Sequence, residues 1–216
     1  MIQFSKSHVT RGAGFLLLSL GVFTACDNGE PVEPEALEVA TVQDVPADPD
    51  AERGAAASYT FFDLDTGTIL SKSDSATNSW DLAFAGTSIL INGGSSGPGQ
   101  GSAQIIDGVF DNITEAPETG FVVDAADAPA IPTSGDNSWY IYTGEGGTPA
   151  HAILPVPGKV IALTTGEGKY ALVEIISYYE GNPDTSSETF ADLSTRAASR
   201  YFTFQYVVQP DGGRTF

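Results

Sequence analysis

The chain has 216 residues, of which 28 are Asp or Glu and only nine are Lys or Arg. All 28 acidic residues but only seven of the nine basic ones follow Cys26, which gives that part of the chain a formal charge of −21. Because contacts to nucleic-acid phosphates require Lys and Arg, this composition excludes nucleic acid as a partner and disfavours anionic membrane surfaces.

Residues 1–25 have the layout of a secretory signal peptide. Lys6 and Arg11 precede a short apolar run at residues 15–23, and small residues then lead to Cys26. The run is too short for a membrane span, which needs roughly 20 apolar residues. A cysteine directly after the cut resembles the lipobox of bacterial lipoproteins, in which the thiol is acylated. The sequence thus predicts lipidation at Cys26, with an ordinary signal peptide and an incidental cysteine as the alternative.

Residues 26–57 are expected to form a disordered tether behind the lipid anchor. The stretches at 30–35 and 46–52 are rich in proline and acidic residues, and the tether contains no aromatic residue. Such a segment cannot bury enough apolar area to offset its chain entropy, and proline and like charges extend it. We therefore expect it to hold a folded domain away from a membrane.

From residue 58 to residue 216 the sequence predicts a single all-β domain. Short strand-like runs alternate with turn residues, and two tight turns, at 65–67 and 166–169, predict hairpins. One short helix is expected near residues 187–199. The strand-like runs lie at residues 59–62, 68–70, 80–84, 88–91, 139–142, 159–165, 170–176 and 200–208.

The run at residues 80–84 alternates between apolar and polar positions at its start. With a period of two, Trp80, Leu82 and Phe84 face the interior, and Asp81 lies between the first two of them. This alternation predicts a half-buried strand with the three large side chains in the core.

Motifs of enzymes and ion sites are incomplete in this chain. The Asp-Thr-Gly-Thr sequence at 65–68 occurs once, whereas aspartic proteases need two such aspartates sharing a proton. A calcium loop starting at Asp63 fails at Gly67, where a ligand is needed. The glycine-rich loop at 97–101 lacks the Gly-Lys-Ser/Thr of a phosphate-binding loop. We therefore predict no enzyme, no catalytic residues and no metal site.

His151 is the only histidine after the signal peptide, so a zinc site with several His or Cys ligands is impossible within one chain. Imidazole and phenol side chains can both ligate haem iron. The haem-ligand candidates are therefore His151, Tyr140 and Tyr142. The alternatives are a histidine that satisfies a turn and tyrosines that pack across neighbouring strands.

An ordered set of segments between about residues 58 and 208 carries a resemblance to a known family. The segments are residues 59–67, 79–84, 92–101, 139–142, 151–159, 175–179 and 201–206. Taken together they resemble the HmuY family, which consists of secreted haem-binding lipoproteins of some Gram-negative bacteria. The resemblance implies a twisted two-layer antiparallel β domain with a haem cleft at one end.

The same resemblance implies a lipid-anchored protein of the outer membrane and cell surface that binds haem for iron acquisition. Members of the family pass haem to an outer-membrane receptor and hold its iron with two His or Met side chains. The corresponding positions here are about Gly144 and the loop at 124–138, which contain neither residue type. We therefore expect haem binding without the family's two-His ligation. The alternative is a lipoprotein of the same fold that binds a non-haem ligand or a partner protein.

The negative charge of the chain would repel the haem propionates unless basic residues lie near the cleft. The candidates for this role are Lys159, Lys169 and Arg200. Where these three residues lie in the fold is therefore part of the test of haem binding.

Overall fold

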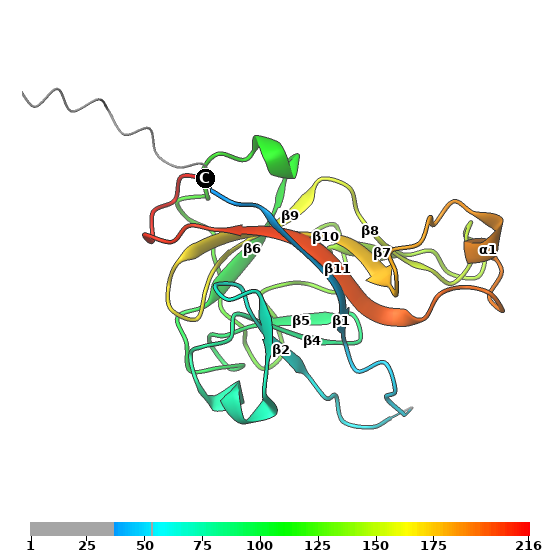
Figure 1. The fold of residues 1–216 in the computed structure, drawn as a ribbon, viewed down its shortest axis with the longest axis horizontal. Helices are drawn as coiled ribbons and strands as arrows, with labels where there is room; N and C mark the ends of the chain where they lie inside the picture. Colours follow the sequence, from blue (N-terminus) through cyan, green and yellow to red (C-terminus); the bar gives the residue numbers. More distant parts are fainter. Residues whose placement is uncertain (1–36, 53) are drawn as a thin grey trace, which may run out of the picture. The chain divides into compact units, whose positions relative to one another are not determined.

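The computed structural model describes residues 37–52 and 54–216, so the predicted signal peptide, Cys26 and the first part of the predicted tether lie outside the described residues. The described part is nearly all β, which confirms the predicted fold class (Figure 1). Within it, no helix is long and apolar enough to cross a membrane. The strands are β1 (Ala40–Pro46), β2 (Thr60–Asp63), β3 (Thr68–Leu70), β4 (Leu82–Ala85), β5 (Ser88–Ile91), β6 (Ser102–Asp107), β7 (Tyr140–Tyr142), β8 (Ile153–Pro155), β9 (Lys159–Thr164), β10 (Tyr170–Tyr179) and β11 (Ser199–Val208).

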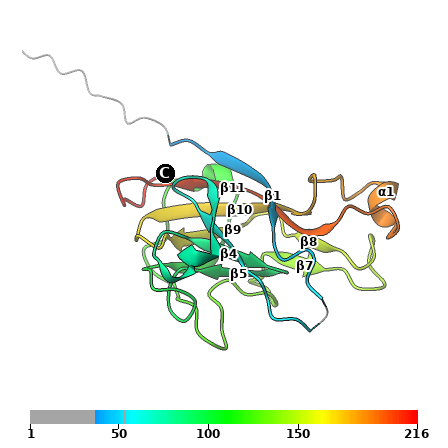
Figure 2. The ribbon, with the colours of Figure 1, turned by 60° about the horizontal axis from the view of Figure 1, so that its bottom comes forward.

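These strands form two main layers and a small ribbon. The larger sheet has the order β1-β11-β10-β9-β6, and the smaller one has the order β3-β2-β4-β5. All the pairings within these sheets are antiparallel. Strands β7 and β8 pair separately as a two-stranded ribbon. In Figure 2 the layer of β9, β10 and β11 lies over β4 and β5, and the β7–β8 ribbon lies at the end of the domain that also carries α1 (Glu188–Ala191).

The two predicted hairpins are present. β2 and β3 pair around the turn at 65–67, and β9 and β10 pair around the turn at 166–169. In the first turn, one oxygen of Asp63 accepts hydrogen bonds from the N–H groups of Asp65 and Thr66, at 2.9 and 3.2 Å. This side-chain bonding to the backbone is a common way for aspartate to build a turn.

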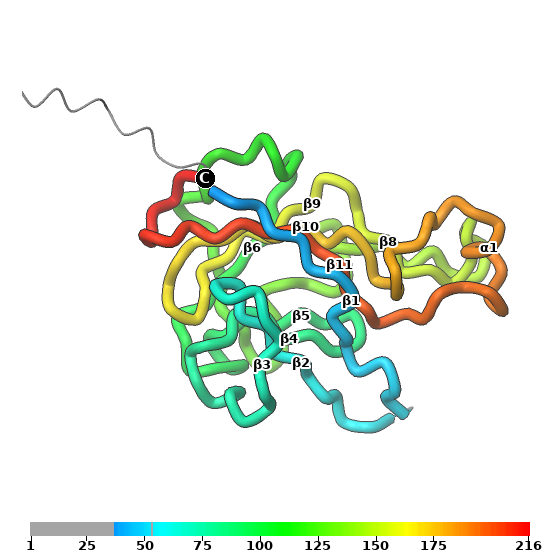
Figure 3. Tube along the Cα trace, viewed as in Figure 1, coloured from blue at the N-terminus to red at the C-terminus, as the bar shows by residue number. Residues whose placement is uncertain are grey.

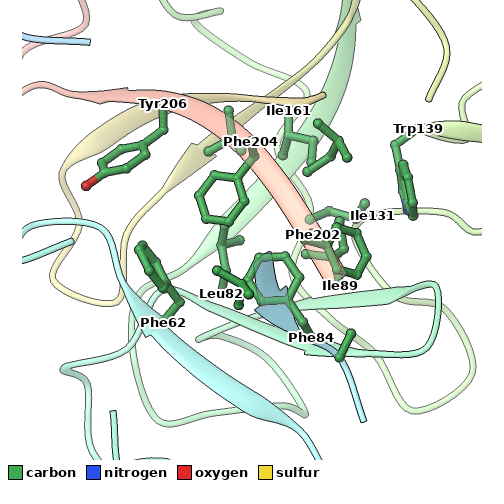
Figure 4. Close-up of a cluster of buried hydrophobic side chains, with 14 of the residues drawn as sticks. Phe62, Leu82, Phe84, Ile89, Ile131, Trp139, Ile161, Phe202, Phe204 and Tyr206 are labelled. Carbon is green, nitrogen blue, oxygen red and sulfur yellow. The ribbon is translucent and has the colours of Figure 1, made fainter. Parts of the chain in front are cut away.

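The core lies between the two sheets and is rich in aromatic side chains (Figure 4). Phe84 of the smaller sheet packs on Phe202 and Phe204 of β11, with ring centroids 4.8 and 5.6 Å apart. Phe62 meets Phe204 edge to face at 5.3 Å. Alternate residues of β11 thus form an apolar surface on which the smaller sheet packs. The period-two pattern of the β11 sequence predicts this arrangement.

Trp80, Leu82 and Phe84 are fully buried, as predicted, but the residues between them are buried as well. Asp81 is only 3% exposed, since its carboxylate accepts hydrogen bonds from two backbone N–H groups of neighbouring loops. The predicted alternation therefore identifies the three core residues correctly. It is wrong for Asp81, which is buried and not on a solvent-facing side of the strand.

The predicted tether of residues 26–57 is too long, because β1 lies within it. β1 pairs with β11 in antiparallel register, from Ala40 opposite Tyr206 to Pro46 opposite Tyr201. Figure 3 shows the chain of β1 running beside β11. Val45 is 1% exposed and joins the core. The prediction failed because the acidic and proline-rich flanks dominate the composition of residues 26–57. The short strand between them contains β-branched residues, which favour strands.

The predicted helix near residues 187–199 is much shorter than expected. It comprises only Glu188–Ala191, and Ser187 caps it by accepting a hydrogen bond from the Phe190 N–H at 3.2 Å. Phe190 is buried against Tyr179, so a single turn is enough to place it. The remaining residues form turns that lead into β11.

Candidate functional site

The β7–β8 ribbon carries all three haem-ligand candidates. Tyr140 lies opposite Pro155 and Tyr142 lies opposite Ile153 in its register. The ribbon is fixed at its base by Trp139, which is 2% exposed and donates its indole N–H to the carbonyl of Thr87 at 3.2 Å. The loop between the strands, residues 143–152, includes His151.

This loop is held in one shape by its own backbone. Thr143 donates its N–H to the carbonyl of Ala152 at 2.9 Å, and its hydroxyl accepts the Ala152 N–H at 2.8 Å. The His151 N–H donates to the carbonyl of Gly144 at 2.8 Å. His151 itself has a φ of +53°, a left-handed conformation that is uncommon for residues other than glycine. Backbone strain of this kind is enriched at binding sites, where the surrounding structure maintains it.

The structure brings Tyr142 and His151 together. The Tyr142 hydroxyl lies 2.6 Å from Nδ1 of His151, and the two ring centroids are 6.1 Å apart. Both side chains face solvent, and Tyr142 is 58% exposed. We call these two side chains the Tyr142–His151 pair. They present an accessible oxygen and an accessible nitrogen, both of types that can bind a metal ion, at the end of the domain.

Tyr140 does not join them. Its ring packs on Trp139 with centroids 4.6 Å apart, and its hydroxyl donates to Thr87 Oγ1 at 3.3 Å. It is partly buried in the junction between the ribbon and the smaller sheet. Tyr140 thus has a packing role, which was the alternative considered for it.

Arg196 supports the loop from the side and was missed by sequence analysis. Its guanidinium donates to the carbonyls of Ala150 at 2.9 Å, His151 at 3.3 Å and Phe190 at 2.7 Å. The guanidinium carbon also lies 4.7 Å from the centre of the Phe190 ring. No motif marks Arg196; it reaches the loop only because the turn after α1 folds against the β7–β8 ribbon.

The three basic residues expected near the site are engaged elsewhere. Lys159 pairs with Asp107 at 2.7 Å, and Lys169 pairs with Asp65 at 2.8 Å. Arg200 donates to the carbonyl of Asp48 at 2.7 Å. Arg196 is a basic residue that the structure places against the backbone of the loop that carries His151.

The positions that correspond to the family's two ligands have structural roles here. Gly144 shapes the β7–β8 loop with a φ of +69°. In the other segment, buried Asp124 accepts hydrogen bonds from the N–H groups of Ile91 at 3.0 Å and Ala130 at 2.7 Å. Across residues 37–52 and 54–216, no group of three or more His, Cys, Asp or Glu residues could hold a metal ion.

An apolar groove of about 520 Å³ lies on the other face of the ribbon. Successive side chains of a strand point to opposite faces, so Ile141 turns toward this groove while Tyr142 turns away from it. Ile141 is 55% exposed and Ile176 of β10 is 38% exposed. The groove is lined by Ile141, Leu154, Pro155, Val156, Pro157, Glu174, Ile175, Ile176 and Thr185.

Asp81 is the most perturbed carboxyl group of the described part. Its Oδ1 accepts the Gly166 N–H and its Oδ2 accepts the Leu64 N–H, each at 2.8 Å. Burial raises the pKa of Asp81 to about 7, although these two hydrogen bonds act in the opposite direction. The hydrogen bonds join two hairpin turns across the domain, which makes Asp81 a structural residue.

Comparisons with known proteins identify the family and related folds. The model of the family described as HmuY protein matches residues 55–191. The solved structure of apo PinO from Porphyromonas gingivitis is similar, with a TM-score of 0.51 and 15% sequence identity over 81% of this chain and 99% of that one. An apo HmuY analog from Tannerella forsythia, at 13% identity over 84% of this chain and all of that one, gives a TM-score of 0.43. Among curated proteins, the sequence has no match.

Proposed function

Because the chain belongs to the HmuY family, we propose that it is a surface lipoprotein that binds haem or a closely related metalloporphyrin for iron acquisition. The observation that carries this proposal is the Tyr142–His151 pair, an exposed oxygen and nitrogen donor pair at the end of the domain. Both residue types ligate haem iron in proteins.

The surroundings of the pair support an anionic, planar ligand. The Arg196 guanidinium has five N–H groups, and three of its nitrogens donate to the backbone carbonyls of Phe190, Ala150 and His151. Its positive charge offsets part of the repulsion between an acidic chain and the propionates of haem. The partly buried Ile153, opposite Tyr142 in the register, adds apolar surface on the same face.

The proposed site differs from one with two protein ligands on the iron. It offers one oxygen and one nitrogen atom that could hold the iron, and the apolar groove lies on the opposite face of the ribbon. Fewer iron bonds and less buried apolar area lead to weaker binding. We therefore expect modest affinity and a coordination different from that of the two-ligand relatives.

Location and partners form the second part of the proposal. Lipidation at Cys26 anchors the chain in the outer membrane, and the acidic segment behind it holds the domain at the cell surface. Haem is then delivered to a receptor in the same membrane. The signal-peptide layout and the family membership support this arrangement.

Titration of the purified protein with haemin, followed by visible absorption, tests the proposed ligand. We expect a saturable change in the Soret region for the native protein. A Tyr142→Phe and His151→Asn double variant is expected to lose most of it, while Tyr140→Phe, which changes a hydroxyl on the same strand, should retain it. A native protein whose mixture with excess haemin gives only the spectrum of free haemin would contradict haem binding.

The apolar groove favours a second candidate function. Its exposed isoleucines, Ile141 and Ile176, offer a surface for a non-haem ligand or a partner protein. A protein of this kind would leave haemin unbound and would lose its ligand when Ile141 is replaced by a charged residue. The haemin titration therefore separates the two candidates.

A further inference from the structure

The larger sheet is apolar on both faces, and the smaller sheet covers only one of them. A second cluster of buried side chains lies on the other face, because successive residues of a strand point to opposite sides of a sheet. Its members on the strands are Val160 and Ala162 of β9, Leu172 of β10 and Val207 of β11. The second face of an antiparallel sheet commonly faces water, so an apolar one requires a cover of its own.

Two short segments that are fastened together form this cover. One begins with a single 3-10 turn, η2 (Phe110–Asn112), and the other comprises residues 214–216. The Phe216 N–H donates to the carbonyl of Thr114 at 2.8 Å, and the Ala116 N–H donates to the carbonyl of Arg214 at 2.7 Å. Figure 1 marks the end of the chain beside the start of β1, so residues from both ends of the domain meet over this face.

The cover leaves a pocket of about 290 Å³ open. Phe110, Leu172 and Val207 line it and are each at most 4% exposed, so they form its floor. Leu37 and Val39 also line the pocket, and Val39 is 46% exposed. The pocket shares no lining residue with the apolar groove beside the β7–β8 ribbon.

The charges around the pocket favour a cation over an anion. No Lys or Arg lines it, and Arg214 of the cover is paired with Glu115 at 2.7 Å. Asp111 lines the pocket and is exposed, and within residues 37–52 and 54–216 its carboxylate forms no ion pair. A positively charged group at the mouth is therefore attracted and a negatively charged one is repelled. Haem, which carries two propionates, does not match this pocket.

The volume limits the size of the ligand. Since a group the size of a water molecule takes up about 30 Å³ in a liquid, the pocket holds roughly ten such groups. We propose that this pocket binds one alkyl chain of roughly eight to ten carbons with a positively charged head group, the chain lying on the apolar floor and the head beside Asp111. This site is independent of haem binding, so a negative haemin titration would leave it standing.

The test measures binding of alkyltrimethylammonium ions, from butyl to tetradecyl, by calorimetry. Cys26→Ser serves as the parent protein, so that neither a lipid nor a detergent is present. Decanoate and decanol are the anionic and uncharged probes of matched chain length. Three variants are made in this parent: Val39→Phe fills the mouth of the pocket, Asp111→Asn removes its charge, and Ile141→Phe makes the same kind of change in the other groove.

We expect the affinity of the parent to rise about twofold to fourfold with each added methylene and to level off near ten carbons. The decyl cation should bind at least about fivefold more tightly than decanoate, and Asp111→Asn should remove most of this difference without changing the affinity for decanol. Val39→Phe should lose binding of every probe, whereas Ile141→Phe should match the parent. The methyl resonances of Leu172 and Val207 should shift on binding.

Several results would overturn the proposal. Equal binding by Val39→Phe and the parent would place the site elsewhere, and equal affinity for decanoate and the decyl cation would contradict the role of charge. A parent that binds none of the probes would leave the pocket to another occupant. Binding that then appears only in Val32→Glu would assign the pocket to the chain's own residues 27–36, and a dimer in light scattering that Val39→Phe dissociates would assign it to a second copy.

Discussion

Asp81 shows how one residue can stabilise the fold and also make its stability depend on pH. It is a buried carboxyl group whose two oxygens each accept a backbone N–H, one from the β2–β3 turn region and one from the β9–β10 turn. Burial raises its pKa from 3.8 to about 7. The protonated form is therefore favoured in the folded state relative to the unfolded chain.

The sign of the resulting pH dependence follows from this shift. The contribution of Asp81 to stability is fully present below pH 4 and is lost as the pH rises toward 7, because only the unfolded chain ionises freely in that window. Denaturant unfolding at several pH values should show that the free energy of unfolding declines between pH 4 and pH 7. This decline should be smaller in Asp81→Asn. That variant should also be less stable by about 1–3 kcal/mol at low pH, since the amide cannot accept both N–H groups. If the free energy of unfolding fell equally steeply with pH in both proteins, the raised pKa of Asp81 would be contradicted.

Trp80 should be a major contributor to the stability of the smaller sheet. It is fully buried, donates its indole N–H to the carbonyl of Ser75 at 3.1 Å and meets Phe61 edge to face at 5.0 Å. Trp80→Ala should lower the free energy of unfolding by about 3–5 kcal/mol. The matched control is Leu193→Ala, at a side chain that is 61% exposed, for which we expect a change within about 0.5 kcal/mol. Similar losses in both variants would count against the core described above.

At the scale of elements, local sequence signals predicted the hairpins but not the first strand. The turns at 65–67 and 166–169 can be predicted from their glycine and aspartate residues, because these residue types favour turns within a span of a few residues. β1 has no such turn beside it, and it is stable only because β11, more than 150 residues later, provides its partner. Local composition cannot predict pairing between strands so far apart in the sequence. Here the flanking acidic residues and prolines dominated that composition and led to the prediction of a tether.

The Tyr142–His151 pair illustrates the same limit for the site. Both residues, and also Tyr140, are haem-ligand candidates from the sequence on chemical grounds. Which two meet depends on the register of a three-residue ribbon and on the shape of its loop. Arg196 had no signal at all, because it reaches the loop through tertiary contacts made by the turn after α1.

Val45 offers a direct test that β1 belongs to the folded domain. Its side chain is 1% exposed and contacts the core. Val45→Ala should therefore lower stability by roughly 1.5–3 kcal/mol. Val39→Ala removes the same atoms from a side chain that is 46% exposed and should change stability by about 0.5 kcal/mol or less. If denaturant unfolding gave the same midpoint for both variants, residues 40–46 would be part of a tether as first expected.

At the scale of the whole molecule, the strongly acidic composition and the expected anchor are consistent with a soluble domain held at a surface. Cys26 should be acylated in the protein isolated from its host, because residues 1–25 have the layout of a signal peptide with a short apolar run. Mass spectrometry of the intact protein should show the lipid, and Cys26→Ser should lack it and leave the membrane fraction. An intact mature protein with a free Cys26 thiol would refute the anchor.

We propose that this domain binds haem through the Tyr142–His151 pair. The most direct measurement is the visible spectrum of the purified monomer titrated with haemin. We expect saturable binding of modest affinity with a high-spin or mixed-spin spectrum, because one protein ligand leaves the sixth position of the iron to water or to a second molecule. A tight complex with the low-spin spectrum of two axial side-chain ligands, formed by the monomer, would contradict the account.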